Sequence, residues 1–286
     1  PVELETDVQV ESLLDGGLRG ELKVTRRLHE SLMTQIIRLD AQSDTLVFDT
    51  VVDWKELHRL LKVEFPVDVE TVEGINEIQF GYMKRPLHRS RQYDKDRFEV
   101  CNHRYTALCD ESHGAAVLND CKYGVSMSQR AAGGSSVELT LLRASASPEM
   151  RADNRVHHFV YGFMAWEGSF LESPVVHRGY ELNVPMRTAE GIACLPSPFR
   201  LDQENVILET VKAAEDGSGD LILRLYESKH ADTTVNLETR WDVERASICN
   251  MLEEEEETLI SGKFGLSLHM KPFEIKTLRI GFGKRG

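Results

Sequence analysis

Alternation of apolar and polar residues at every second position restricts the fold of this chain more than any other feature. Such a period of two, with many β-branched and aromatic residues, is typical of β-strands. Long stretches with apolar residues at helical spacing are absent; 53–58 is expected to form a short turn, and 174–183 is ambiguous. We therefore predict an all-β chain built as antiparallel sandwiches. The alternation is clear in residues 22–26, 36–40, 46–54, 60–66 and 137–143.

A second group of strands follows a proline-containing stretch at 195–199. Proline and serine at such a point are typical of a linker. Beyond it, residues 206–211 and 221–227 flank the turn-forming segment 216–220, which predicts a β-hairpin. We expect two domains, a large one over 1–195 and a smaller β-sandwich over 196–286.

Charge and cysteine usage exclude several classes of function. The 286 residues carry a formal charge of −13, from 47 acidic and 34 basic residues, whereas nucleic-acid binding requires a basic surface. No apolar run is long enough to span a membrane. The five irregularly spaced cysteines fit no disulfide framework, so we expect free thiols and a cytoplasmic location. The first residues resemble no signal peptide and lead directly into strand-like sequence, as expected for a chain cut from a longer one.

Motifs that carry chemistry are scarce. His230-Ala231-Asp232 has a spacing that would suit a metal on a strand, but its polar surroundings favour a loop. His157 and His158 are neighbours on a predicted strand, so their rings should point to opposite faces. The stretch 133–136 is typical of a glycine turn, and the glutamates at 253–257 are typical of a solvated loop or edge.

Polar and aromatic residues are densest in three segments, 78–88, 98–105 and 117–124. Each segment is interpreted as a strand that runs out into polar loop residues, which is a mixture that sugar sites favour. We predict that four residues border a substrate pocket: His88, Asp120, Lys122 and Tyr123. The alternative is that the segments form a polar face between domains, with Asp120 capping a turn and Lys122 solvated.

These segments also resemble the cytosolic and vacuolar branch of the class II α-mannosidases, glycoside hydrolase family 38. The resemblance covers nearly the whole chain in order, and it includes Leu118-Asn119-Asp120-Cys121-Lys122-Tyr123-Gly124. One departure is Arg155, which stands where the family tends to have glycine and puts the shape of the loop 152–156 in doubt. The other matching stretches are 48–54, 61–66, 78–81, 85–88, 97–100, 141–144, 152–153, 157, 212–217, 224–227 and 272–278.

The resemblance implies a fold and an activity that the residues alone do not establish. It implies a galactose-mutarotase-like supersandwich followed by a smaller sandwich, placed after a catalytic domain and a helical bundle that would be the partners of this chain. It implies retaining hydrolysis of terminal α-mannosides by an aspartate nucleophile, with a divalent metal, usually zinc, in the catalytic domain. No stretch here matches the nucleophile or metal-ligand motifs, so we assign no catalytic residue and no metal ligand to this chain.

Two other functions stay open at this point. The chain is either an inactive part of a mannosidase or a stand-alone carbohydrate-binding or assembly module. A sugar epimerase is a third alternative, because the mutarotase fold also hosts such enzymes. An epimerase needs a placed acid and base, and His88, His103 and Glu99 are the residue types that would supply them. A homo-oligomer is compatible with each of these readings.

Overall fold

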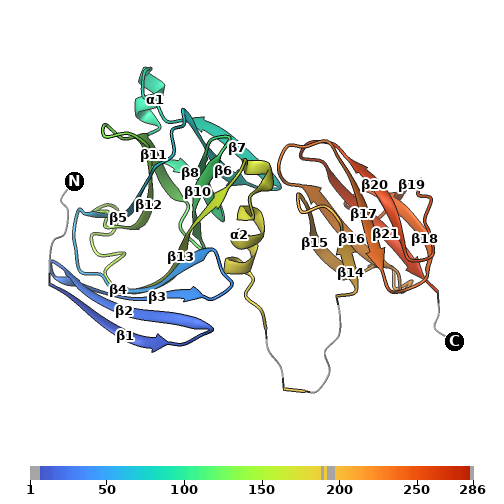
Figure 1. Cartoon of the computed structure of the whole chain (residues 1–286), viewed down its shortest axis with the longest axis horizontal. Helices are drawn as coiled ribbons and strands as arrows, with labels where there is room; N and C mark the ends of the chain where they lie inside the picture. Colours follow the sequence, from blue (N-terminus) through green and yellow to red (C-terminus); the bar gives the residue numbers. More distant parts are fainter. Residues whose placement is uncertain (1–6, 188–189, 192–196, 284–286) are drawn as a thin grey trace. The chain divides into compact units, whose positions relative to one another are not determined.

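The computed structural model describes residues 7–187, 190–191 and 197–283 of the chain. They fall into two compact units, both rich in strands (Figure 1). The first unit takes the residues up to 78 and 83–187, and the second takes 79–82 with the residues after 187. The prediction of an all-β chain with a larger and then a smaller β region is confirmed. The predicted boundary between residues 195 and 196 lies outside the described residues and stays a prediction.

A nine-stranded sheet forms one layer of the first unit. Its strand order is β1-β2-β3-β4-β13-β10-β9-β6-β7, and consecutive strands such as β2 and β3 pair antiparallel over long registers. β-branched residues are frequent in these strands because they fit a pleated, half-buried surface. The strands are β1 Val8–Asp15, β2 Arg19–Leu28, β3 Ser31–Asp40, β4 Thr45–Asp53, β6 Glu73–Ile78, β7 Gly81–Pro86, β9 Tyr105–Cys109, β10 His113–Asn119 and β13 Val156–Glu167.

A four-stranded sheet in the order β5-β12-β11-β8 forms the other layer. Aromatic rings join the two layers: Phe65 of β5 stacks on Phe163 of β13, with ring centroids 5.1 Å apart. Tyr161 stacks on Phe48 at 4.9 Å, and its hydroxyl accepts a hydrogen bond from the Gln35 amide at 2.7 Å. This shared core explains why both sheets are apolar on their facing sides. The strands are β5 Leu60–Val67, β8 Val100–Cys101, β11 Gly124–Gln129 and β12 Ser135–Arg143.

The ambiguous segment 174–183 forms a helix, α2 (Val175–Asn183), which lies against β10 and β13. Val175 and Val176 are buried, and the Asn183 amide donates a hydrogen bond to the Asn119 carbonyl at 3.0 Å. Tertiary packing therefore decides a conformation that local spacing leaves open. Two shorter helices are present in the described part of the chain, α1 (Gln92–Asp96) and the 3₁₀-helix η1 (Phe170–Glu172).

The second unit is a β-sandwich with a three-stranded sheet, β14-β17-β20, and a five-stranded sheet, β15-β16-β21-β18-β19. Along β17 the residues alternate strictly between buried and exposed, with Val235 and Leu237 in the core. The two sheets enclose one cluster that includes Leu223, Leu268 and Ile280. The strands are β14 Phe199–Leu201, β15 Val206–Ala213, β16 Leu221–Glu227, β17 Thr233–Thr239, β18 Val243–Cys249, β19 Glu255–Thr258, β20 Gly265–Met270 and β21 Ile275–Phe282.

Most local predictions agree with this structure, with two corrections. The hairpin over 206–227 is confirmed as β15 paired with β16. The last three residues of the glutamate run, 255–257, lie on the exposed edge strand β19, whereas the Glu253 side chain is only 12% exposed and pairs with Lys212.

The segment 98–105 is not one strand, because it holds only the two-residue strand β8, and β9 begins at its last residue, Tyr105. The segment 78–88 is not one strand either. A turn at Gln79 and Phe80 separates β6 from β7, and Phe80 has a φ of 56°. A single alternating pattern therefore conceals a tight turn there, because the residues on either side of the turn keep strand-like character.

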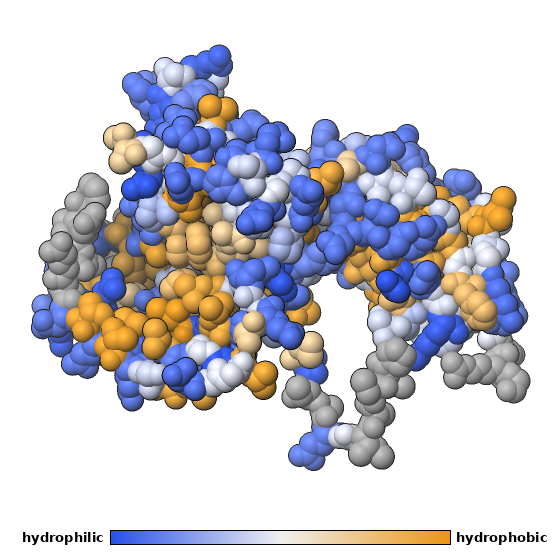
Figure 2. All heavy atoms as spheres, viewed as in Figure 1, coloured by the Kyte–Doolittle hydropathy of each residue, from blue (hydrophilic) through white to orange (hydrophobic). Residues whose placement is uncertain are grey.

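Apolar side chains gather on the surface of the outer strands of the nine-stranded sheet (Figure 2). Every residue of β1 is exposed, and exposed large apolar residues continue onto β2 and β3. Of the described helices, none combines the length and the hydropathy needed to cross a membrane. The exposed large apolar residues of β1, β2 and β3 are Val8, Val10, Leu13, Leu14, Leu22, Leu32 and Leu39.

Candidate functional site

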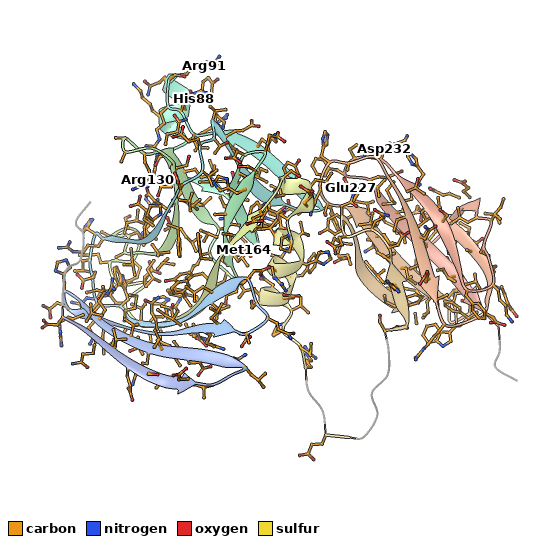
Figure 3. All side chains as sticks on the ribbon, viewed as in Figure 1. His88, Arg91, Arg130, Met164, Glu227 and Asp232 are labelled. Carbon is orange, nitrogen blue, oxygen red and sulfur yellow. The ribbon has the colours of Figure 1, made fainter. Side chains whose placement is uncertain are left out.

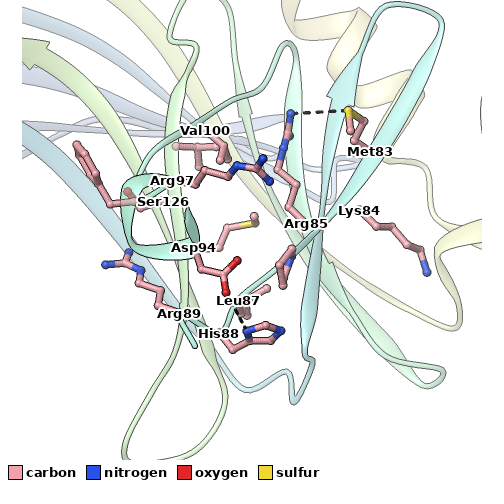
Figure 4. A pocket seen from close by; sticks show the side chains of 14 residues that line it. Met83, Lys84, Arg85, Leu87, His88, Arg89, Asp94, Arg97, Val100 and Ser126 are labelled. Carbon is pink, nitrogen blue, oxygen red and sulfur yellow. Dashed lines mark hydrogen bonds and ion pairs between the residues drawn. The ribbon is translucent and has the colours of Figure 1, made fainter. Parts of the chain in front are cut away.

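The segment between β7 and α1 borders a cavity of about 140 Å³ in the first unit (Figure 4). His88, one of the four predicted border residues, lines this cavity. Its Nδ1 atom lies 3.0 Å from the Ser90 hydroxyl and 3.8 Å from the carboxylate of Asp94. Asp94 is buried and accepts the backbone N–H of Arg91 at 2.9 Å. The loop that carries His88 is therefore tied to the start of α1.

The turn after β10 carries the other three predicted border residues, and two buried asparagines fix its shape. The Asn119 amide donates to the side-chain oxygen of Asn102 at 3.0 Å and to the carbonyl of His103 at 2.7 Å. The side-chain oxygen of Asn119 accepts the N–H of Lys122 at 2.7 Å, and Asn102 donates to the carbonyl of Tyr123 at 3.0 Å. A buried network in which these bonds are all made holds its turn in one conformation.

The side chains of this turn supply a carboxylate (Asp120), an ammonium group (Lys122) and a phenol (Tyr123). One carboxylate oxygen of Asp120 accepts the Val160 N–H at 3.0 Å, and the other is buried, with the Cys121 thiol close to the carboxylate. The Lys122 ammonium lies 4.3 Å from the centre of the Phe159 ring. The Tyr123 side chain is 56% exposed. Such a mixture of groups suits hydroxyl-rich ligands, since it offers donors, an acceptor and an aromatic face.

The structure brings Asp120, Lys122 and Tyr123 onto one turn and places His88 on another segment. None of those three residues is among the side chains that line the cavity beside His88. The buried asparagines Asn102 and Asn119 had no predicted role. The signal for them is their position at strand ends, since Asn119 is the last residue of β10.

The H-x-D triplet lies in a loop, as its polar surroundings predict. His230 follows β16, is exposed and has a φ of 61° (Asp232 is labelled in Figure 3). Asp232 lies 3.5 Å from His269 Nε2, with both side chains more than half exposed. Among the described residues, no three histidine, cysteine, aspartate or glutamate side chains gather as a metal site would require. The described part of the chain therefore does not fit a zinc centre.

The paired histidines of β13 have different partners, as their alternation predicts. The His157 ring donates to the carbonyl of Asp153 at 2.7 Å, and His158 Nε2 lies 2.6 Å from the carboxylate of Asp49. His158 is exposed and His157 is half-buried. The exposed Arg155 lies in the same loop as Asp153, and its N–H donates to the Asp153 carbonyl at 2.9 Å. These contacts hold the loop before β13 together.

The acid that an epimerase would need is already engaged. The Glu99 carboxylate accepts a hydrogen bond from the Thr140 hydroxyl, and it lies 3.6 Å from the Lys62 ammonium. His88 lines the cavity described above, whereas the His103 ring lies edge-on to Tyr123, with ring centroids 5.6 Å apart. The contacts of Glu99 with Thr140 and Lys62 therefore do not favour its use as the acid or base of an epimerase.

Four cysteines are described, and all are free thiols: Cys101, Cys109, Cys121 and Cys249. The fifth, Cys194, lies outside the described residues.

We expect a thiol-specific reagent to titrate five thiols in the denatured, unreduced protein. In the folded protein, burial raises the pKa of Cys109 to about 11, so little of it is the reactive thiolate at pH 8 and its modification should be slow. A count of three or one in the denatured protein would instead reveal disulfides.

Comparison with known proteins identifies the family. Residues 1–151 match the family described as glycosyl hydrolases family 38 C-terminal domain. Residues 205–278 match the family described as glycosyl hydrolases family 38 C-terminal beta sandwich domain. The two matches follow each other in the same order as the two units of the fold.

Curated relatives and solved structures agree with these matches. The chain is 36% identical to alpha-mannosidase 2C1 of Mus musculus, over 92% of this chain and 26% of that protein. It is also 36% identical to alpha-mannosidase G of Dictyostelium discoideum, over 86% of this chain and 23% of that protein. The fold is similar to that of an alpha-mannosidase from Enterococcus faecalis, with a TM-score of 0.79 at 15% identity, over 97% of this chain and 35% of that one. The chain thus spans about a quarter of the length of these curated relatives, and it belongs to glycosyl hydrolase family 38 as a C-terminal β region of that family.

Proposed function

We propose that this chain is the C-terminal β region of a retaining α-mannosidase that removes terminal α-mannosyl residues. The observation that carries the proposal is the ordered match of both units to the C-terminal domains of one hydrolase family. The 36% identity to proteins named as alpha-mannosidases supports the activity assigned to the whole protein. No observation in the described residues favours an epimerase or a stand-alone binding module.

In this proposal the chemistry belongs to a catalytic domain outside this chain, whose nucleophile is an aspartate and whose metal is zinc. The β region supports that domain, and the longer protein works in the cytoplasm on mannosides or oligosaccharides. The free thiols of the four described cysteines are consistent with a reducing compartment. A helical bundle between the two parts, and self-association of the whole protein, belong to the same proposal.

We further propose that the turn after β10, with His88, borders the substrate pocket of the longer protein. The buried asparagines hold the turn rigidly, and a rigid support is what a substrate-contacting side chain needs. The exposed ring of Tyr123 is the group of this turn that a ligand can reach, whereas the second oxygen of Asp120 is buried, so that Asp120 would act by fixing the turn. Asp120 also has a structural bond to Val160, so its replacement must keep that acceptor.

The test uses Asp120→Asn and Tyr123→Phe in the longer protein that joins this chain to its catalytic domain. Asparagine keeps the acceptor for the Val160 N–H and removes the negative charge, and phenylalanine keeps the ring and removes the hydroxyl. We expect each change to lower kcat/KM for an aryl α-mannoside at least tenfold, which corresponds to about 1.4 kcal/mol of transition-state stabilisation. The melting temperature should move little.

The matched control is Asp242→Asn, which makes the same chemical change at an exposed aspartate of the second unit. Its kinetics should equal those of the unmodified protein. If both test variants also keep unmodified kinetics, the turn does not border the pocket, although the family assignment is unaffected. If the longer protein hydrolyses no α-mannoside, the proposed activity is wrong.

A further inference from the structure

More cationic than anionic side chains line the cavity beside α1. Lys84, Arg85, Arg89 and Arg97 line it, and the one carboxylate among its lining residues is that of Asp94. This excess of positive charge stands out in a chain whose formal charge is −13. The labelled side chains of Figure 4 show Arg85 and Arg97 extending into the same region of the cavity.

The three arginines that line the cavity have no carboxylate partner in the described part of the chain. Arg85 donates one hydrogen bond to the carbonyl of Cys101 at 3.0 Å and makes a long contact with the sulfur of Met83 at 4.0 Å. The Arg97 guanidinium lies over the ring of Tyr93 at 5.3 Å and makes no hydrogen bond or ion pair with the residues that the structure describes. Partial burial lowers the pKa of Arg85, and the like charge of Arg97 lowers it further.

Asp94 does not relieve this repulsion, because it is already occupied. It is buried, accepts the N–H of Arg91 at 2.9 Å and faces His88 and Ser90. Lys84 is paired with Glu73 at 2.8 Å, so its charge is already compensated outside the cavity. The unmet charge is therefore that of Arg85 and Arg97, to which Arg89 adds. Two neighbouring guanidinium groups without a carboxylate partner are well suited to bind a carboxylate or a phosphate, since each group presents a planar fork of donors.

Much of the rest of the cavity wall is apolar, with the side chains of His88 and Ser126 as further polar lining. Leu87, Val125 and Met127 are buried, and Val100 is half-buried beside them. The cavity volume of about 140 Å³ is roughly ten times the space that one water requires by the same measure. A simple inorganic anion would satisfy the arginines but leave the apolar wall facing water, which is unfavourable.

We propose that this cavity binds a small organic anion, whose carboxylate or phosphate pairs with Arg85 and Arg97 and whose apolar part lies on Phe98, Val100 and Met127. The two parts of the site set two requirements for the ligand. The charge supplies most of the affinity through the guanidinium groups, and the apolar wall distinguishes an organic anion from a free inorganic one. The site lies within the first unit, and it does not depend on the proposed mannosidase activity.

The test is isothermal titration calorimetry of the folded chain with three probes: phenyl phosphate, inorganic phosphate and neutral benzyl alcohol. We expect phenyl phosphate to bind at least tenfold more tightly than either of the others. Arg97→Gln removes one unpaired guanidinium without breaking a hydrogen bond of the fold, and it should weaken phenyl phosphate binding at least tenfold. Arg85→Lys keeps the charge but loses the fork, and it should weaken binding several-fold.

The matched control is Arg91→Gln, which removes the same charge from the residue before α1, outside the cavity lining (Arg91 and His88 are labelled in Figure 3). Its affinity for phenyl phosphate should change less than twofold. Equal binding of phenyl phosphate and benzyl alcohol, or equal losses in Arg97→Gln and Arg91→Gln, would overturn the anion site. Equal binding of phenyl phosphate and inorganic phosphate would overturn the organic part of the ligand. A benzoate titration then separates carboxylate from phosphate as the preferred group.

Discussion

The purified chain, assayed alone with an aryl α-mannoside, is expected to release no product above the uncatalysed rate, with or without added zinc. Covalent glycoside hydrolysis requires a positioned nucleophile and a second acid–base group. In the family that this chain belongs to, the nucleophile and metal motifs are expected in the part that these 286 residues do not match. Removing a covalent nucleophile can lower kcat by roughly 10⁶-fold, so we expect no measurable turnover.

The longer protein that includes the catalytic domain is the positive control for this assay, under the same zinc and buffer conditions. If the catalytic domain prepared without the β region is inactive, mixing it with the separate chain would also test whether association of the two restores its turnover. Turnover that co-purifies with the separate chain and persists in an independently prepared sample would show that this part of the protein holds catalytic groups of its own.

Glu227→Ala is expected to destabilise the second unit by about 3 to 5 kcal/mol, since each buried donor left unsatisfied costs about 1–3 kcal/mol. Glu227, at the end of β16 and labelled in Figure 3, is fully buried. Its carboxylate accepts the Asn205 amide at 3.0 Å, the Lys229 N–H at 2.8 Å and the Phe273 N–H at 3.0 Å. Alanine would leave all three donors without this acceptor and would also create a cavity.

Urea unfolding of the chain measures this loss, and two variants bracket it. Glu227→Gln keeps the shape and one acceptor oxygen, so its loss should be smaller than that of the alanine variant. Glu238→Ala, at an exposed position of β17, should change the free energy of unfolding by less than about 0.5 kcal/mol. A Glu227→Ala variant as stable as the Glu238→Ala variant would mean that other contacts hold the segments that contain the three donors to Glu227.

The sequence predicts best the elements in which side-chain alternation and burial coincide. In β17 every second residue is buried, so the pattern and the core carry the same information. The hairpin of β15 and β16 was equally clear, because turn-forming residues separate two apolar runs. Helix α2 could not be predicted from spacing, since its packing against β10 and β13 determines its conformation. The turn at Phe80 was missed because a positive φ at a non-glycine residue has no local signal.

The candidate site was predictable only in part. The sequence brought Asp120, Lys122 and Tyr123 together because they are neighbours along the chain. Whether His88 shares their pocket depends on how separate segments pack, which alternation does not encode. The proximity of Arg85 to Arg97 was also missed. Eleven residues lie between them in the sequence, and the fold of the loop around α1 brings them close together.

The acidic edge strand β19 has a consequence for how the molecule behaves among copies of itself. The terminal strand of a sheet offers unpaired backbone groups that another strand can join, which is how ordered aggregates begin. Here that strand contains three consecutive glutamates, Glu255 to Glu257, all exposed. A second copy approaching in register would bring like charges directly opposite each other, which opposes cross-strand pairing. The same run of charge that carries no catalytic chemistry thus opposes growth of the five-stranded sheet at this edge.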